Sequence, residues 1–228
     1  MKYIKLETHC HCLGGSGCAS AKSEEIIEEY QALGYGGVVL TNHLNQACFN
    51  AYKGNSKNEK YDYWYSLVDD LKEKRQRSDF KIFCGMEVQV RSEIGAFQEF
   101  MLYGFKKSFL YNHKPLFTYT QEELFRLADE NGIFMYQTHP FRNGVFTGNP
   151  FYMHGAEAFN GNSNHNNHNE EAEDFCLKNK LIQMSGSDYH AGGQKICAGI
   201  VIPDDISDEQ ELTNYIFNKK IILIKNNV

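Results

Sequence analysis

The sequence predicts an α/β fold in which a parallel sheet closes, or nearly closes, into a barrel with helices outside. Short apolar segments of strand length alternate along the chain with amphipathic segments of helical period, which is the pattern of successive β/α units. About seven such units fit into the 228 residues, a common size for one α/β barrel. No linker divides the chain, so we expect a single domain spanning residues 1–228.

Strand and helix signals alternate from the start of the chain. We expect Ser23 to cap the first helix, with Glu24 and Glu25 in its first turn, where carboxylates interact favourably with the helix dipole. Gly34 ends that helix. The other elements expected in this half are strands at 3–7, 37–41, 81–84 and 99–105 and a helix at 61–75.

The second half continues the alternation. Thr120 and Glu123 form a capping-box pattern that opens a helix, and Gly132 closes it. The segment 160–169 is rich in Asn and His, and this turn-forming composition predicts a loop. The other elements expected are strands at 133–137, 156–159, 181–184, 199–202 and 221–224 and helices near 170–179 and 208–218.

Composition limits the classes of partner and compartment. The net charge of −6 should repel a phosphate backbone, so we expect no nucleic-acid partner, whereas a small anionic substrate fits if metal ions supply local positive charge. The N-terminus lacks the apolar core of a signal peptide, and no apolar stretch could span a bilayer, so no membrane partner is expected. Seven irregularly spaced cysteines favour a reduced, cytoplasmic setting, whereas the oligomeric state stays unknown.

Polar, metal-capable side chains follow the C-terminal ends of the expected strands, one strand after another. In a parallel barrel these ends meet at one face, where active sites are built. The fold alone therefore predicts that these side chains converge. They are His9, His11, His43, Glu87, His139, Asp188 and His190.

Two residue pairs give this pattern its metal-binding character. His9 and His11 are two positions apart, so on extended backbone both imidazoles point to the same side. Asp188 and His190 repeat this spacing with one carboxylate. Mixed imidazole and carboxylate ligands suit zinc, manganese or iron, and a carboxylate such as Glu87 can bridge two ions.

The remaining histidines and most cysteines receive an ordinary structural interpretation. A single loop histidine is usually a surface or hydrogen-bonded residue, and alternation places Cys10 and Cys12 opposite the two histidines of the first strand. The histidines set aside are His113, His154, His165 and His168. The cysteines interpreted as structural are Cys10, Cys12, Cys48, Cys84, Cys176 and Cys197.

This ordered set of motifs resembles the PHP (polymerase and histidinol phosphatase) family of metal-dependent phosphoesterases over nearly the whole chain. The resemblance implies a distorted (β/α)7 TIM-like barrel holding two or three divalent metal ions. The motifs that carry it are His9-Cys10-His11, Leu40-Thr41-Asn42-His43, Gly85-Met86-Glu87, Thr138-His139-Pro140-Phe141-Arg142 and Ser185-Gly186-Ser187-Asp188-Tyr189-His190.

The resemblance also implies how the ligands are shared. His9, His11, Glu87 and Asp188 would hold the first ion. Glu87 would bridge to a second ion that His139 also binds, and His43 and His190 would face a third.

The sequence departs from the family pattern at two positions. Glu99 stands near the place where members often have a further histidine ligand, and it is either a substitute ligand or a solvent-facing strand residue. Cys18 falls where members commonly carry an Asp or His, so either its thiolate is a ligand or the third ion is weak or absent.

The chemistry expected of such a centre is histidinol-phosphatase-like hydrolysis of a small phosphate monoester. Arg142 can grip a phosphate oxygen, with a surface ion pair as the alternative, and Asn160 can orient substrate or cap its loop. Asp188 and His190 complete the catalytic set, and either His190 or a metal-bound water can protonate the leaving alcohol.

Three other functions remain open. An amidohydrolase-type metallohydrolase would share the strand-end ligands, although we find no bridging lysine at a strand end. A protein-tyrosine phosphatase on the same scaffold and a non-catalytic metal-binding module are the other two.

Overall fold

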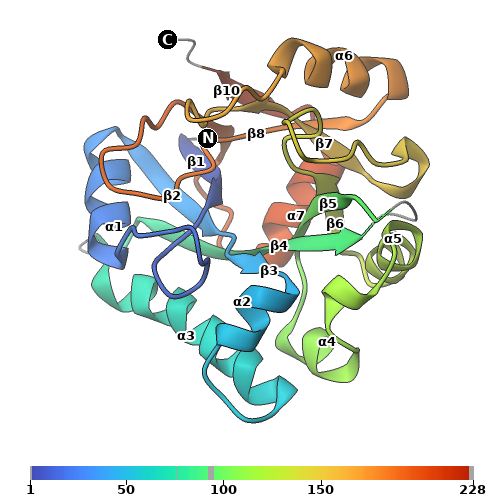
Figure 1. Cartoon of the computed structure of the whole chain (residues 1–228). Coiled ribbons are helices and arrows are strands. Elements are labelled where there is room, and N and C mark those ends of the chain that lie inside the picture. Colours follow the sequence, from blue (N-terminus) through green and yellow to red (C-terminus); the bar gives the residue numbers. More distant parts are fainter. Residues whose placement is uncertain (1, 76, 92–94, 226–228) are drawn as a thin grey trace.

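The computed structural model describes residues 2–75, 77–91 and 95–225. Within these ranges the chain forms one ten-stranded sheet that curls into a nearly closed barrel, with helices around its outside (Figure 1). The strands are β1 (Tyr3–Cys10), β2 (Tyr35–Leu40), β3 (His43–Leu44), β4 (Lys81–Arg91), β5 (Phe97–Tyr103), β6 (Phe134–Gln137), β7 (Gly155–Asn160), β8 (Ile182–Gly186), β9 (Ala198–Pro203) and β10 (Ile222–Lys225).

The helices connect these strands over the outer surface of the barrel. They are α1 (Ser23–Ala32), α2 (Gln46–Ala51), α3 (Lys57–Lys74), α4 (Lys107–Asn112), α5 (Gln121–Glu130), α6 (Asn169–Asn179) and α7 (Glu209–Asn218), with short 3-10 turns at Leu116–Thr118 and Pro150–Tyr152. Of the described helices, none is long and apolar enough to cross a membrane.

The sheet is mixed, which corrects the expectation of an all-parallel barrel. Its order is β10-β9-β1-β2-β4-β5-β6-β7-β8, with β3 paired to β4. The pairs β4–β5, β5–β6, β1–β9 and β9–β10 are antiparallel, and the others are parallel. The connection from Arg91 to Phe97 is too short for a crossover, which needs about a dozen residues, so β5 must return antiparallel to β4.

The last part of the sheet returns to the first and nearly closes the barrel. The Thr8 hydroxyl on β1 donates to the carbonyl of Ser185 on β8. Just beyond, Cys10 and Tyr189 form an isolated parallel bridge. The ends of β1 and β8 therefore lie together at one mouth of the barrel.

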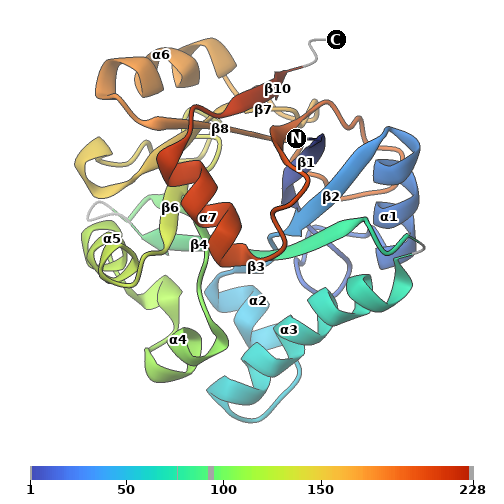
Figure 2. The ribbon, with the colours of Figure 1, turned by 180° about the vertical axis from the view of Figure 1, so that it is seen from behind.

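Apolar side chains fill the barrel interior at the opposite mouth. Leu6, Phe83, Phe134 and Met184 come from strands spaced around the barrel and belong to one buried cluster. Helix α7 adds side chains to the same cluster, and Figure 2 shows this helix lying across the barrel opening. Because packing closes this mouth, we expect the functional site at the other mouth of the barrel.

Local details confirm some expectations and correct others. Thr120 is the N-cap of α5 and forms the expected capping box with Glu123. Ser23 was expected to be the N-cap of α1, but Lys22 occupies that position. Ser23 lies inside the first turn, where its hydroxyl donates to Asp70 on α3 and ties the two helices together.

Candidate metal centre

The predicted ligands gather at the mouth of the barrel opposite α7. His9 lies near the end of β1, His11 follows directly after this strand, and both are fully buried. The Nε2 atom of His9 lies 3.4 Å from both Oε1 of Glu87 and Oδ1 of Asp188. The Nε2 atom of His11 lies 3.4 Å from Oε2 of Glu87 and 3.5 Å from Oδ1 of Asp188.

Glu87 is the residue around which the other ligands are arranged. It was expected after a strand, but it lies inside β4, which runs on past it. Its Oε1 atom is 3.2 Å from Nε2 of His139, and its Oε2 atom is 2.8 Å from Nδ1 of His43. Because its two oxygens face different histidines, this carboxylate is suited to bridging two ions.

The ligand atoms form three overlapping groups, each with all its atoms within 4.8 Å of one another. The groups share members, as expected for a cluster of neighbouring ions rather than for isolated sites. They are His9 with Glu87 and His139, His9 with His11 and Asp188, and His11 with His43 and His190.

Several buried atoms in this cluster have no hydrogen-bond partner, although they lie close together. These include Nε2 of His9 and Nε2 of His11. A buried polar atom without a partner costs free energy, and native proteins rarely leave one so. Bound divalent cations would satisfy these atoms together, so the side chains present fit a multi-ion centre.

The electrostatics of the cluster suit cation binding. Burial raises the pKa of Glu87, but the nearby His9 and His43 outweigh it and hold that pKa well below its usual value. The pKa of Asp188 is likewise held low by His9 and Arg142 against the effect of burial. Burial, together with His190 and His43, lowers the pKa of His11, which keeps this ring in the neutral form that metal ligation needs.

Glu157 is a site residue that the sequence analysis missed. It lies on β7 and is 1% exposed. Its carboxylate lies 3.0 Å from Nδ1 of His9 and accepts hydrogen bonds from the backbone N–H of His139 and from the Asn160 amide. A carboxylate behind a ligating histidine fixes the ring tautomer and its orientation. An acidic residue within an apolar strand, in Gly155-Ala156-Glu157-Ala158-Phe159, was the available signal.

Two ligands adopt backbone conformations that side chains rarely take. The φ angle is 28° at His139 and 48° at Asp188. Non-glycine residues at positive φ cost about 1–3 kcal/mol, and they cluster at functional sites where surrounding contacts hold them. Both residues lie just past a strand end, so the strained backbone turns each side chain into the barrel mouth.

Cys18 lies beside the outermost group of histidines. Its thiol hydrogen-bonds with His190 and His43. Burial raises the thiol pKa, but these contacts outweigh it and lower the pKa to about 6. The lowered pKa favours the thiolate form, and a thiolate next to two imidazoles is a set of donors that zinc accepts.

Glu99 lies at the edge of the cluster, on the antiparallel strand β5. Its Oε2 atom is 3.7 Å from Nε2 of His139, and its Oε1 atom accepts a hydrogen bond of 2.9 Å from Gln89. Its side chain is 13% exposed, so it points into the barrel mouth rather than to open solvent.

Arg142 and Asn160 form one hydrogen-bonded unit with Asp188. The Nη2 group of Arg142 donates to Oδ2 of Asp188 at 2.6 Å and to Oδ1 of Asn160 at 3.0 Å. The Nε group of Arg142 donates to Oδ1 of Asn167. Asn160 therefore positions the guanidinium, and it also accepts from the Asn162 backbone within its own loop.

These side chains line a cavity of about 280 Å³ at the barrel mouth. His165 belongs to the lining of this cavity, although the sequence analysis gave it a structural interpretation. The other three histidines with that interpretation do not line the cavity and form hydrogen bonds with other residues. His113 bonds to the Phe109 carbonyl, His154 to Asp129 and His168 to Glu171. The lining residues are Cys18, His43, Glu99, His139, Arg142, Asn162, Asn164, His165, Asp188 and His190.

All seven cysteines are free thiols, as expected without a disulfide framework. The six interpreted as structural are buried, and Cys18 alone among the seven is exposed.

Comparison of the sequence with protein-family models gives no match, and comparison with curated proteins gives none either. Solved structures do match. A two-domain protein from Bacteroides vulgatus, containing a predicted PHP-like metal-dependent phosphoesterase, gives a TM-score of 0.66 at 18% identity, over 99% of this chain and 65% of that one. PsfC from Pseudomonas syringae gives 0.70 at 13% identity, over 99% of this chain and 93% of that one.

A DNA-processing enzyme has the same architecture. Endonuclease Q, in complex with a 27-mer duplex substrate carrying an abasic lesion at the active site, gives a TM-score of 0.66 at 14% identity. The alignment covers 96% of this chain and 58% of endonuclease Q. The chain thus spans less than two thirds of this structure and of the Bacteroides protein.

This match corrects our expectation about partners. We predicted a small phosphorylated substrate and no nucleic acid, and that prediction was wrong, because a protein of this fold is seen with a nucleic-acid duplex at its active site. Net charge averages over the whole surface, whereas ions bound at one mouth set the local field. The barrel of this chain has the fold of the PHP-like metal-dependent phosphoesterases.

Proposed function

We propose that this protein is a metal-dependent hydrolase that cleaves phosphoester bonds in nucleic acid. The observation that carries the proposal is the set of three ligand groups that overlap through His9 and His11, with their unpartnered buried nitrogens. Structural packing does not require such an arrangement, whereas two or three neighbouring ions do.

The side chains divide naturally among the ions. His9, His11 and Asp188 hold the first ion, together with Glu87. Glu87 extends to a second ion with His139, and Glu99 reaches the same side of His139.

The third ion site is formed by imidazoles and a thiolate. His11, His43 and His190 provide the imidazoles, and Cys18 supplies the thiolate. The Nδ1 atom of His190 is hydrogen-bonded to the Asp188 carbonyl, which leaves Nε2 as its ligand atom.

Divalent ions bound by these side chains would supply Lewis acidity for charge on the phosphoryl oxygens and for the attacking water. Arg142 binds the substrate phosphate. It is already aligned by Asp188, Asn160 and Asn167, so little conformational freedom is lost when it contacts a phosphoryl oxygen. Glu157 and Thr138 bind no substrate but keep the rings and the Glu87 carboxylate in place.

Nucleic acid is the substrate class that the comparisons support. Endonuclease Q has this fold and carries a DNA duplex at its active site. The acidic net charge of −6 includes the buried carboxylates Glu87, Glu157 and Asp188, whose charge bound cations would offset.

A substrate panel tests the proposal. Protein loaded with zinc, manganese or iron is assayed against bis-p-nitrophenyl phosphate, single-stranded and duplex oligonucleotides with and without an abasic site, and a set of amides and lactones. We expect hydrolysis of the diester and the oligonucleotides, abolished by Asp188→Asn and unchanged by Arg77→Ala, whose side chain pairs with Asp79 at the surface. Turnover of amides or lactones without turnover of any phosphoester would reject the proposal.

A further inference from the structure

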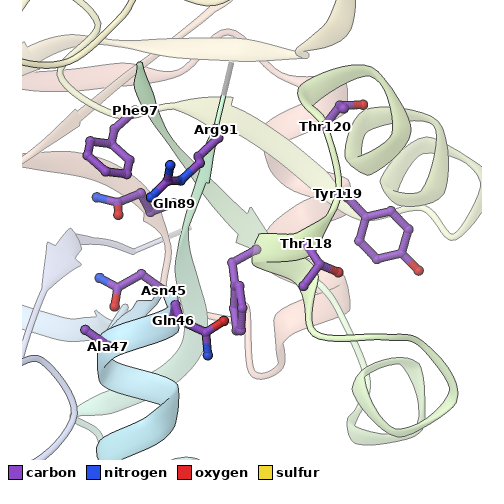
Figure 3. A pocket seen from close by; sticks show the side chains of 10 residues that line it. Asn45, Gln46, Ala47, Gln89, Arg91, Phe97, Thr118, Tyr119 and Thr120 are labelled. Carbon is purple, nitrogen blue, oxygen red and sulfur yellow. The ribbon is translucent and has the colours of Figure 1, made fainter. Parts of the chain in front are cut away.

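A groove of about 640 Å³ lies next to the metal centre (Figure 3). Among the residues that the structure describes, its lining carries amides, hydroxyls, aromatic rings and one arginine, and no carboxylate. In a chain with net charge −6 this composition is distinctive, because a lining without acidic groups does not repel a phosphate. The lining residues are Asn45, Gln46, Ala47, Gln89, Arg91, Phe97, Phe117, Thr118, Tyr119 and Thr120.

The register of the β4–β5 hairpin connects this groove to the metal centre. Glu87, Gln89 and Arg91 alternate along β4, so their side chains project from the same face of the strand. Gln89 pairs with Glu99 across the hairpin, and Arg91 pairs with Phe97. Along the hairpin, the Gln89 pair and then the Arg91 pair lie successively farther from the Glu87 carboxylate.

One hydrogen bond and one short chain segment show that the cavity and the groove are adjacent. Glu99 lines the metal cavity and accepts a hydrogen bond of 2.9 Å from Gln89, which lines the groove. On the neighbouring segment, His43 lines the cavity, and Asn45, two residues later, lines the groove.

The outer end of the groove presents an aromatic face and a cation together. The Phe97 side chain is 42% exposed, although large apolar rings are usually buried. The Arg91 guanidinium lies 5.3 Å from the centroid of this ring. Figure 3 shows Gln89, Arg91 and Phe97 together on the hairpin, while the Tyr119 ring points away from them.

We propose that this groove binds the nucleotide that flanks the scissile phosphate, with its base stacked on Phe97 and its phosphate held by Arg91. The proposal rests on the proposed function, because the reacting phosphate must sit at the metal centre. Base stacking on an aromatic ring and phosphate binding by arginine are how proteins bind single-stranded nucleic acid. The Asn45 oxygen accepts from the Cys48 backbone and the Gln89 Nε2 group donates to Glu99, so Nδ2 of Asn45 and Oε1 of Gln89 are the atoms offered to the base edge.

The kinetic test compares a substrate that reaches the groove with one that does not. The ratio of kcat/KM for a single-stranded oligonucleotide to kcat/KM for bis-p-nitrophenyl phosphate is measured in each variant. We expect Phe97→Ala to lower this ratio at least about tenfold, and Phe97→Tyr to restore most of it, because tyrosine keeps a stacking face. The control is Phe151→Ala, which removes a ring that is 84% exposed outside the groove. An unchanged ratio in Phe97→Ala would overturn the proposal.

Binding measurements separate this inference from the proposed function. Anisotropy of a fluorescent single-stranded oligonucleotide is titrated at several salt concentrations without turnover. Arg91→Ala should weaken binding and flatten its salt dependence by about one unit of slope, whereas Arg77→Ala should change neither. If the wild type hydrolyses no phosphoester but Phe97→Ala still weakens binding, the proposed hydrolase function is wrong and only the binding of single-stranded nucleic acid in the groove is supported. Equal binding by wild type, Phe97→Ala and Arg91→Ala would reject the groove.

Discussion

Oε1 of Glu157 lies 3.0 Å from Nδ1 of His9, while Nε2 of the same ring faces Glu87 and Asp188 without a hydrogen-bond partner. One nitrogen is therefore fixed as a donor, and the other is left free to bind a cation. This arrangement makes Glu157 a positioning residue for the first ion rather than a ligand.

Replacing Glu157 by Gln should weaken metal binding by about 10- to 100-fold, because the amide cannot accept from both His9 and the backbone of His139. The measurement is competition with a chelating dye for zinc or manganese. The matched control is Glu173→Gln, which changes a half-exposed carboxylate on α6 that pairs with Lys225. Equal affinities for wild type and Glu157→Gln would contradict the positioning role.

Coordination by the Cys18 sulfur should give the third ion a spectroscopic signature. In protein loaded with cobalt(II), a thiolate ligand should give an intense near-ultraviolet charge-transfer band, and Cys18→Ser should remove it. Cys84→Ser serves as the control, because Cys84 lies near Glu209 at the other mouth of the barrel. Persistence of the band in Cys18→Ser, or its absence from the wild type, would show that Cys18 binds no ion.

Gly186 lies against His9 and should not tolerate a side chain. A Cβ atom at this position would come within 2.4 Å of the His9 Cβ and 2.9 Å of Oε1 of Glu157. We expect Gly186→Ala to lower the free energy of unfolding by about 1–3 kcal/mol and to weaken metal binding as His9 shifts. Gly17→Ala is the matched control, since a Cβ there meets nothing within 4 Å. Urea denaturation and the dye competition check both effects, and equal results for the two variants would contradict this geometry.

His154 lies away from the metal centre, and its shifted pKa should make the stability of the protein depend on pH. Burial lowers its pKa below 6.5, and its Nδ1 atom accepts from the backbone N–H of Met135. The unfolded chain therefore takes up a proton before the native state does, so stability should fall as the pH drops below about 6.5. His154→Asn keeps an acceptor but does not titrate, and it should flatten this slope in urea denaturation at several pH values. A slope identical to that of the wild type would exclude His154 as its source.

The part of the site that could be predicted from the sequence is the part that lies at strand ends. His43, His139 and Asp188 each follow an apolar segment by a few residues, so their positions along the chain show where strands end. Glu157 was missed for the opposite reason. It lies inside an apolar strand, where alternation makes a carboxylate look solvent-facing, and only closure of the barrel shows that this face is the interior.

Strand direction could not be predicted from the same patterns. The alternation of apolar and polar residues looks the same whichever way a strand runs in the sheet. We therefore assigned β5, β9 and β10 to parallel units, although they pair antiparallel. The short helices α2 and α4, of six residues each, also carry too few turns to give a helical period. The family pattern nevertheless fixed the fold, because it depends on the order of the motifs and not on strand direction.

The most direct test of the central claim is anomalous scattering from a crystal grown with manganese. The account predicts at least two peaks in the barrel mouth, one coordinated by His9, His11 and Asp188 and another by His139, with Glu87 between them. An anomalous map with no peak among these side chains, in protein shown to be folded, would contradict it.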